Sequence, residues 1–206
     1  MMNAEKALQM LIEGNERYIE GTADGAELTI STRRQGIKDG QNPFAVILGC
    51  SDSRVPAELV FNRGLGDLFV IRVAGNIVAP SQIGSVEFAC QHFGTQLVVV
   101  LGHSHCGAIN ATVDSLMDDP DKLSPNVASI VDRVTPAVHP IVKRNQFKDR
   151  EDLIHQAMRA NVEQSVNGLQ MRSRFLRELV DSGQIKIVGA EYSIETGVVD
   201  FYLGNL

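Results

Sequence analysis

The sequence has few cysteines, no long apolar run and no excess of positive charge, and each lack argues against a class of protein. Its three cysteines are an odd number, which fits metal binding or catalysis in a reducing compartment better than a disulfide framework. Wholly apolar runs, such as Leu97 to Leu101, are far shorter than the roughly 20 residues that span a bilayer. A net charge of −6 argues against nucleic acid or an anionic membrane as the main partner.

The N-terminus also lacks the basic region and apolar core of a secretory signal peptide. We therefore expect a cytoplasmic protein, although a leader removed from a precursor would leave no trace in this chain. A length of 206 residues suits one domain with a substantial core. We expect residues 1–206 to form that single domain, with an N-terminal helical arm and loop in 1–40 and an α/β core in 41–206.

The hydrophobic pattern alternates between strands and helices. Strands are predicted where apolar residues follow one another without polar alternation, and helices where they recur every three or four positions. The predicted strands are 44–49, 67–73, 96–101, 185–189 and 198–203. The predicted helices include 3–20, 83–93, 108–117 and 151–181, the last as a long helix and a shorter one. This order predicts an α/β fold with an open, mostly parallel central sheet, flanking helices and an antiparallel edge strand that closes a hairpin.

Two other segments are less regular. Residues 22–43 are polar and contain glycine, so we expect a loop and a short helix, and in 121–150 we expect one helix and a polar loop, with Pro125, Pro136 and Pro140 as interruptions. The helix predicted for 3–20 has one apolar face, which could pack on its own core or lie as an arm on a second subunit.

Potential metal ligands follow two of the predicted strands. Cys50 comes directly after one strand, and His103 and Cys106 come after another. Ligands bind beyond the carboxyl ends of parallel strands, so these side chains should meet. Three protein ligands with an open fourth position are typical of catalytic zinc, and thiolates favour zinc over magnesium or calcium. Cys106 also precedes a helix, whose N-terminus favours the thiolate, whereas Cys90 lies on an apolar helix face and is interpreted as a core residue.

Asp52 and Arg54 accompany the first cysteine. The carboxylate could be a fourth metal ligand, or it could accept a hydrogen bond from a metal-bound water. Arg54 can hold it through two parallel hydrogen bonds, which would keep it ionised and oriented. A surface ion pair is the alternative, and it would contribute little. His105 is interpreted as a surface group or a neighbour of the metal ligands, and the remaining histidines have no partner in the sequence.

The segments Cys50–Arg54 and His103–Gly107 resemble the signature of the beta-class carbonic anhydrases. The likeness continues through 69–72, 84–88 and 189–192, and it extends from about residue 41 to residue 203. The resemblance implies one Zn²⁺ per subunit, bound by Cys50, His103 and Cys106, with Asp52 and Arg54 as a catalytic dyad. It also implies a homodimer or homotetramer with active sites at the subunit interface.

The same resemblance suggests substrate-binding residues. Gln41 is similar to a glutamine that donates a hydrogen bond to the substrate. Phe69 and Ala74 would line a small apolar pocket together with Phe88 from a second subunit. Gly107, beside the last metal ligand, is assigned to the same site. In some members a tryptophan three residues before the first zinc cysteine forms part of a bicarbonate pocket. This chain has Ile47 there, although Arg72 and Tyr192 match the rest of that pocket.

The resulting hypothesis is reversible hydration of carbon dioxide to bicarbonate and a proton, by attack of a zinc-bound hydroxide oriented by Asp52 and Arg54. At lower pH Asp52 could instead occupy the fourth zinc position and close the site. Two alternatives remain open: a carbon disulfide or carbonyl sulfide hydrolase on the same scaffold, and a noncatalytic zinc protein. A nucleotide-binding enzyme is disfavoured, because Gly64-Leu65-Gly66 lacks a third glycine and precedes a strand.

Overall fold

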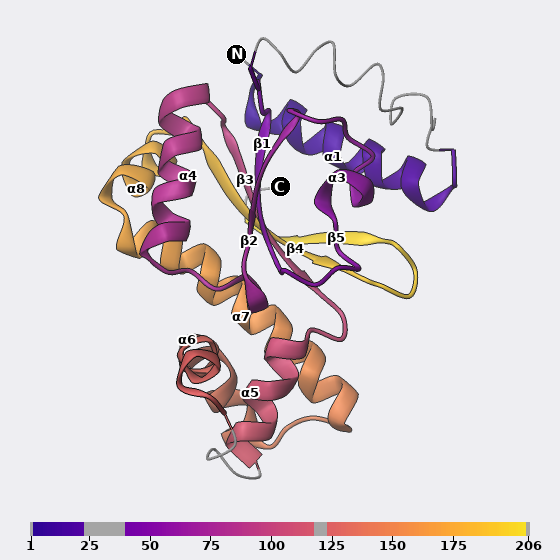
Figure 1. Ribbon diagram of the computed structural model, residues 1–206, viewed down its shortest axis with the longest axis vertical. Coiled ribbons are helices and arrows are strands. Elements are labelled where there is room, and N and C mark those ends of the chain that lie inside the picture. Colours follow the sequence, from indigo (N-terminus) through magenta and orange to yellow (C-terminus); the bar gives the residue numbers. More distant parts are fainter. Residues whose placement is uncertain (1, 23–39, 118–122, 205–206) are drawn as a thin grey trace.

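The centre of the structure is a sheet of five strands in the order β2-β1-β3-β4-β5 (Figure 1). The computed structural model describes residues 2–22, 40–117 and 123–204. β1 to β4 run parallel to one another, and β5 returns antiparallel beside β4 at one edge. The strands are β1 Ala45–Gly49, β2 Leu68–Arg72, β3 Leu97–His103, β4 Lys186–Tyr192 and β5 Val199–Leu203. The predicted α/β fold, with its mostly parallel sheet and antiparallel edge strand, is confirmed.

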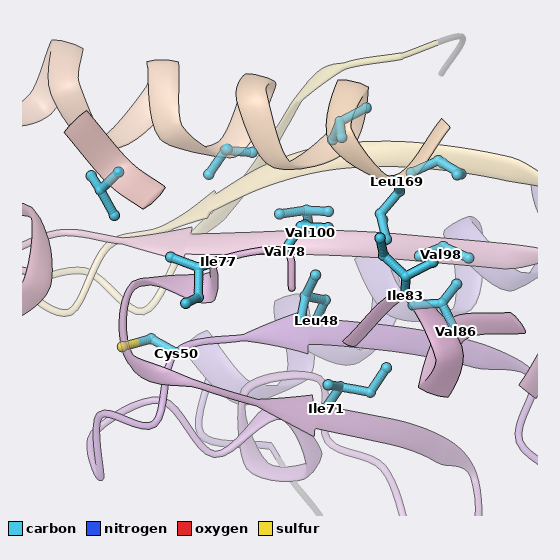
Figure 2. Packing of buried hydrophobic residues seen from close by; sticks show 14 of the residues in the cluster. Leu48, Cys50, Ile71, Ile77, Val78, Ile83, Val86, Val98, Val100 and Leu169 are labelled. Carbon is cyan, nitrogen blue, oxygen red and sulfur yellow. The ribbon is translucent and has the colours of Figure 1, made fainter. Parts of the chain in front are cut away.

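Both faces of the central strands are buried, which explains their unbroken apolar sequences. Successive side chains of a strand point to opposite faces. Along β1, Val46 and Leu48 therefore belong to one core cluster, whereas Ala45 and Ile47 belong to the other. Every residue of β1 and β3 is buried. Figure 2 shows part of the first cluster, with Cys50 at its end beyond the last residue of β1.

One face of the sheet is covered by α1 (Ala4–Ile19) and the short α3 (Ala57–Val60) (Figure 1). The apolar side of α1 packs against strands and α3 of its own chain, where Ala7 and Leu11 are fully buried. The helix ends before Gly21, which has a positive φ of 66° that favours glycine. Of the two interpretations of residues 3–20, packing on its own core is the one that the structure supports.

The opposite face carries α4 (Pro80–Phe93), α7 (Arg150–Arg172) and α8 (Arg174–Asp181). α5 (Gly107–Met117) continues from the end of β3 and packs against α6 (Pro125–Arg144) beside α7 (Figure 1). The long helix and the shorter helix predicted for 151–181 are therefore both present. No helix in the described ranges has an apolar stretch that could cross a bilayer.

α6 is the one helix predicted for residues 121–150, and the predicted loop follows it at 145–149. Pro136 and Pro140 were expected to interrupt this region, but one helix passes through both. A proline inside a helix has no N–H to donate and crowds the carbonyl four residues earlier. Here those carbonyls belong to Asp132 and Pro136, which lie with Pro140 on the exposed side of α6, where water can bond them. Pro125 occupies the first turn, where the missing N–H costs nothing.

Two predicted boundaries can be compared directly with the structure. β3 extends two residues beyond its predicted end, because β4 continues to pair with it until His103 lies opposite Tyr192. α4 ends at Phe93 as predicted, with Gly94 in the left-handed conformation. The predicted loop at 22–43 lies largely outside the described residues, so the division of the chain at residue 40 stays a prediction.

Two glycines let α7 approach the sheet closely. A Cβ at Gly102 of β3 would lie 2.6 Å from Cγ2 of Val162 and 2.7 Å from Sδ of Met158. A Cβ at Gly189 of β4 would lie 2.8 Å from Cγ1 of Val162. Since His103 follows Gly102, the same close packing fixes the end of β3 beneath α7.

Gly102→Ala should lower the free energy of unfolding by about 1–3 kcal/mol, because the added methyl must displace Val162 or Met158 in a filled core. Urea unfolding followed by circular dichroism measures this loss as a lower midpoint. Gly84→Ala in α4 is the matched control, since an added Cβ there has nothing within 4 Å. Its helix propensity should raise the free energy of unfolding by up to about 1 kcal/mol. Equal midpoints for Gly102→Ala and the parent would contradict the close approach of α7.

Candidate metal centre

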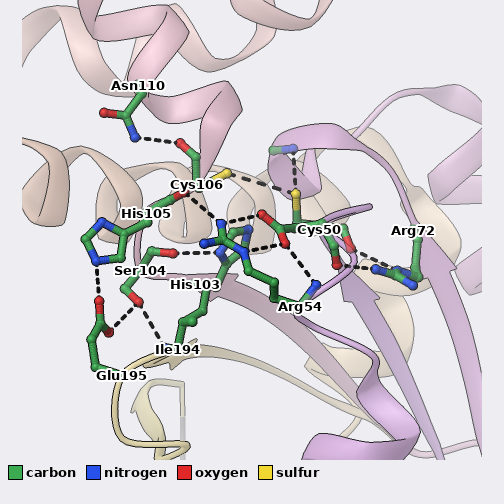
Figure 3. Close-up of polar contacts among 12 residues, drawn as sticks. Cys50, Arg54, Arg72, His103, Ser104, His105, Cys106, Asn110, Ile194 and Glu195 are labelled. Carbon is green, nitrogen blue, oxygen red and sulfur yellow. Dashed lines mark hydrogen bonds and ion pairs between the residues drawn. The ribbon is translucent and has the colours of Figure 1, made fainter.

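Parallel pairing places the ends of β1 and β3 side by side. Gly49 pairs with Leu101, so Cys50 and His103 lie near each other at the same edge of the sheet. Cys106 returns to them because the chain turns tightly between the end of β3 and the start of α5. Ligand atoms of the two cysteines and the histidine all lie within 4.8 Å of one another, and all three residues are buried (Figure 3). The three predicted ligands therefore meet.

The ring of His103 is oriented for metal binding. Its Nδ1 lies 2.8 Å from the carbonyl oxygen of Ser104, which accepts a hydrogen bond from it, so Nε2 presents a lone pair. His103 is fully buried, and within the described part of the chain its Nε2 has no hydrogen-bond partner. A buried polar atom without a partner is costly unless something binds it. Two sulfurs and one imidazole form a donor set that fits zinc.

The sulfurs of Cys50 and Cys106 are 4.0 Å apart and form no disulfide. The hydrogen bond from Cys106 lowers the pKa of Cys50, burial opposes this effect, and the hydrogen bond from the N–H of Gly75 assists it. The thiolate of Cys50 in turn raises the pKa of Cys106, which keeps the shared proton. The thiolate is the form that binds metal. Cys90 differs from both. Burial is the main cause that raises its pKa to about 11, the carboxylate of Glu87 adds to the effect, and the result fits a core position.

Arg54 holds the carboxylate of Asp52 through two side-chain hydrogen bonds. Its Nε donates to Oδ1 at 2.9 Å and its Nη2 donates to Oδ2 at 2.7 Å, while the backbone N–H of Arg54 also donates to Oδ1 at 3.0 Å. The guanidinium holds the pKa of Asp52 well below its usual range, although burial acts in the opposite direction. The two predicted hydrogen bonds from Arg54 to Asp52 are therefore present. The carboxylate of Asp52 does not belong to the group of candidate ligand atoms.

Arg72 supports the same turn from β2. Its Nε donates to the carbonyl oxygen of Cys50 at 2.9 Å, and its Nη2 donates to that of Asp52 at 2.5 Å (Figure 3). The other residues compared with a bicarbonate pocket have different contacts. Ile47 is buried in the core on the α1 side, and the hydroxyl of Tyr192 lies 3.2 Å from that of Tyr18. In this chain Arg72 thus holds the backbone at Cys50 and Asp52.

Glu195, in the turn between β4 and β5, contacts the loop between the candidate ligands His103 and Cys106. No sequence motif predicts this contact. Its carboxylate accepts a hydrogen bond from Oγ of Ser104 at 2.8 Å and pairs with the ring of His105 (Figure 3). It also accepts one from Oγ of Ser193 at 3.0 Å. The bond from Ser104, ahead of the other contacts, lowers the pKa of Glu195 to about 2. Since β4 lies beside β3, the loops that follow them must be neighbours. That adjacency is the signal from which the contact could have been inferred.

A cavity of about 460 Å³ separates this loop from the start of α7. Carboxylates of Asp152 and Glu191 line it, together with His155. Nε2 of His155 lies 3.1 Å from Oε2 of Glu191, and Nε of Arg159 donates to the same oxygen at 2.8 Å. His155, which has no partner evident in the sequence, therefore belongs to a hydrogen-bonded network with Glu191 and Arg159.

Two of the predicted substrate residues adjoin the metal group. Gly107 follows Cys106 and begins α5. Ala74 lies in the 3-10 turn η2 (Ala74–Asn76), whose next residue, Gly75, donates its N–H to Sγ of Cys50 at 3.4 Å. Both residues therefore lie beside the candidate metal centre in the same chain.

The other predicted substrate residues lie farther away. Gln41 precedes β1 and lies against Gly66, which precedes β2, so it is at the amino edge of the sheet. The five residues of β1 separate that edge from Cys50 by about 17 Å. Phe69 and Phe88 neighbour each other, with ring centroids 6.2 Å apart, and Phe88 is 45% exposed. A single chain therefore does not bring Gln41 to the metal group.

The known proteins to which this chain is similar include carbonic anhydrases. A family model described as carbonic anhydrase matches residues 45–199. Carbonic anhydrase 2 of Mycobacterium tuberculosis is 37% identical over 206 residues, which cover 99% of this chain and 96% of that protein. The solved structure of the beta-carbonic anhydrase CcaA is 29% identical, with a TM-score of 0.74 over 97% of this chain and 92% of that one. A tetrameric beta-carbonic anhydrase from Sordaria macrospora, 21% identical, shares the fold with a TM-score of 0.77 over 91% of this chain and 94% of that one.

Glu195 should titrate near pH 2, and Ser104→Ala should raise its pKa towards the ordinary value of about 4.3, because the main hydrogen bond to the carboxylate is lost. Carbon-13 NMR of the side-chain carboxyl measures both values. Because the folded-state pKa is depressed, the contacts of the ionised Glu195 stabilise the fold fully above about pH 4.3. This stabilisation is lost as the pH falls towards 2.

The control for this titration is Ser129→Ala. Ser129 donates its hydroxyl to the carbonyl of Asn126 in α6, so its loss should leave the pKa of Glu195 unchanged. An unchanged pKa in Ser104→Ala would show that Ser104 does not hold this carboxylate.

Proposed function

Since the chain belongs to the beta-class carbonic anhydrase family, we propose that it catalyses reversible hydration of carbon dioxide to bicarbonate and a proton at a zinc ion. Cys50, His103 and Cys106 would hold the metal. The observation that carries the proposal is the fully buried Nε2 of His103, which lacks a hydrogen-bond partner among the described residues and lies beside two sulfurs. The ionised carboxylate of Asp52 in the same turn as Cys50 supports it.

When bound, zinc supplies a Lewis acid that lowers the pKa of a coordinated water towards about 7. Asp52 is ionised, so it can only accept hydrogen bonds, and it orients the attacking water by accepting from its O–H. Oδ1 already accepts two hydrogen bonds from Arg54, whereas Oδ2 accepts one. Oδ2 therefore keeps a free acceptor position for this role. Arg54 and Arg72 hold the carboxylate and its backbone in place, so little reorganisation is needed during turnover.

Carbon dioxide is apolar, and the proposed pocket combines residues of two subunits. Ala74 and Gly107 belong to the chain that would hold the metal, and a second subunit contributes Gln41, which donates to a substrate oxygen, and Phe88 with its neighbour Phe69. The amino-edge position of Gln41 and the 45% exposure of Phe88 support this arrangement. The tetrameric relative from Sordaria macrospora supports a homo-oligomer. We therefore propose a homodimer or a homotetramer of such dimers.

The same proposal treats residues 1–206 as one catalytic domain and places the protein in the cytoplasm. The cytoplasm is a reducing compartment, where cysteines remain thiols. All three cysteines are free in the structure, which supports this location.

Asp52→Asn should retain zinc and lower the rate of carbon dioxide hydration at least about a hundredfold, because the amide no longer accepts as a carboxylate does. Proton release on rapid mixing with carbon dioxide gives the rate, and elemental analysis gives the zinc content. Asp132→Asn on the exposed side of α6 makes the same charge change and should leave the rate unchanged. Full activity of Asp52→Asn would remove this carboxylate from the mechanism.

Zinc removal separates the proposed function from its alternatives. Chelation should abolish turnover and leave the far-ultraviolet circular dichroism spectrum unchanged, whereas loss of a structural zinc should unfold the chain. Carbonyl sulfide in the same assay tests the other substrate class. A zinc-loaded, folded protein without hydration activity between pH 7 and about 9 would refute the proposal.

Mixed oligomers test whether Gln41 acts across the interface. Gln41→Ala and Asp52→Asn chains, separately tagged and purified as heterodimers, should regain up to about half of the parent activity, because one site combines an intact Asp52 with Gln41 from the other chain. Oligomers of each variant alone should stay nearly inactive. Mixed oligomers no more active than the two single variants would show that Gln41 does not serve a neighbouring site.

A further inference from the structure

The turn η2 contacts the first metal ligand through its backbone. The N–H of Gly75 donates to Sγ of Cys50 at 3.4 Å, and this contact is buried. Gly75 has a positive φ of 69°, and an added Cβ would lie 2.9 Å from Cβ of Ala108 in α5. The backbone of η2 can approach both the sulfur and α5 because residue 75 has no side chain.

Two polar side chains of α7 hold η2 in this position. Nδ2 of Asn161 donates to the carbonyl oxygen of Gly75 at 2.8 Å, and Oγ of Ser165, one helical turn later, donates to that of Asn76 at 3.1 Å. Asn161 is 1% exposed and Ser165 is 3% exposed. They lie on a side of α7 that otherwise packs Met158, Val162 and Leu169 into the core.

Asn161 is not explained by core packing. Within the described part of the chain its Oδ1 has no hydrogen-bond partner, so this amide is buried although only its donor side is satisfied. An apolar residue would avoid the cost of burying an unpaired oxygen. What Asn161 provides is a bond to the residue whose own N–H reaches a metal ligand.

We infer that Asn161 is a positioning residue of the metal centre: by holding the carbonyl of Gly75, it aims the N–H of Gly75 at Sγ of Cys50. A hydrogen bond to a ligating sulfur withdraws charge from it and orients it, and such outer contacts tune metal affinity and electronic properties. Through this contact Asn161 links α7, which contributes none of the candidate ligands, to the electronic state of the site. The inference rests on the proposed zinc site.

The matched variants are Asn161→Ala and Ser165→Ala, since each removes one buried hydrogen bond from α7 to η2. Asn161→Ala should lower zinc affinity at least about tenfold in competition with a chelating dye. In the cobalt-substituted protein, its thiolate-to-cobalt absorption band should move to lower energy, because the sulfur loses a hydrogen bond. Ser165→Ala should lose thermal stability yet keep the parent's affinity and band position. If Asn161→Ala does not fold, Asn161→Leu removes the same donor and fills the space.

The outcomes separate this inference from the proposed function. A folded parent chain that binds neither zinc nor cobalt refutes the zinc site and removes the basis of the inference. If the parent binds both metals, unchanged affinity and spectrum in the folded Asn161 variant overturn the inference alone. Equal changes in the Asn161 and Ser165 variants also overturn it, because they would reflect general loosening of η2.

Discussion

The parallel pairing of β1 with β3 is the interaction on which the metal centre depends. Because Gly49 lies opposite Leu101, the residues that follow these strands reach the same edge of the sheet. A slip of one residue would turn the side chains of β1 to the opposite face and separate Cys50 from His103. The two buried cores prevent that slip, since every apolar side chain of both strands packs in one core or the other.

Around these strand ends, polar contacts restrain the segments that carry the chemistry. Arg72 of β2 holds the turn that contains Cys50 and Asp52. Glu195 holds the loop between His103 and Cys106 from the side of β4. The donors and acceptors come from different elements, so the site is positioned by the whole sheet. Such support from outside the ligand set is what keeps a metal site in its productive geometry.

Local patterns in the sequence predict much of this structure, because strand alternation and helical spacing reflect burial directly. The meeting of Cys50, His103 and Cys106 could be predicted from their places after strands, since parallel strands end at one edge. The contacts of Glu195 and Asn161 could not, because each depends on a partner far away in the sequence. The prolines of α6 misled for another reason: their effect depends on whether water reaches the carbonyls they leave unpaired, and only the folded helix shows that Pro140 faces outward.

The position of α7 has a consequence for the energetics of the whole chain. The helix packs on Gly102 and Gly189 and also holds Gly75, so the core and the candidate metal centre share one element. A metal that binds the folded chain and not the unfolded chain stabilises it, by about 1.4 kcal/mol for each tenfold excess over the dissociation constant. Part of that stabilisation should reach α7 through η2, and in the loaded protein the helix should exchange its amide hydrogens more slowly than packing alone would dictate.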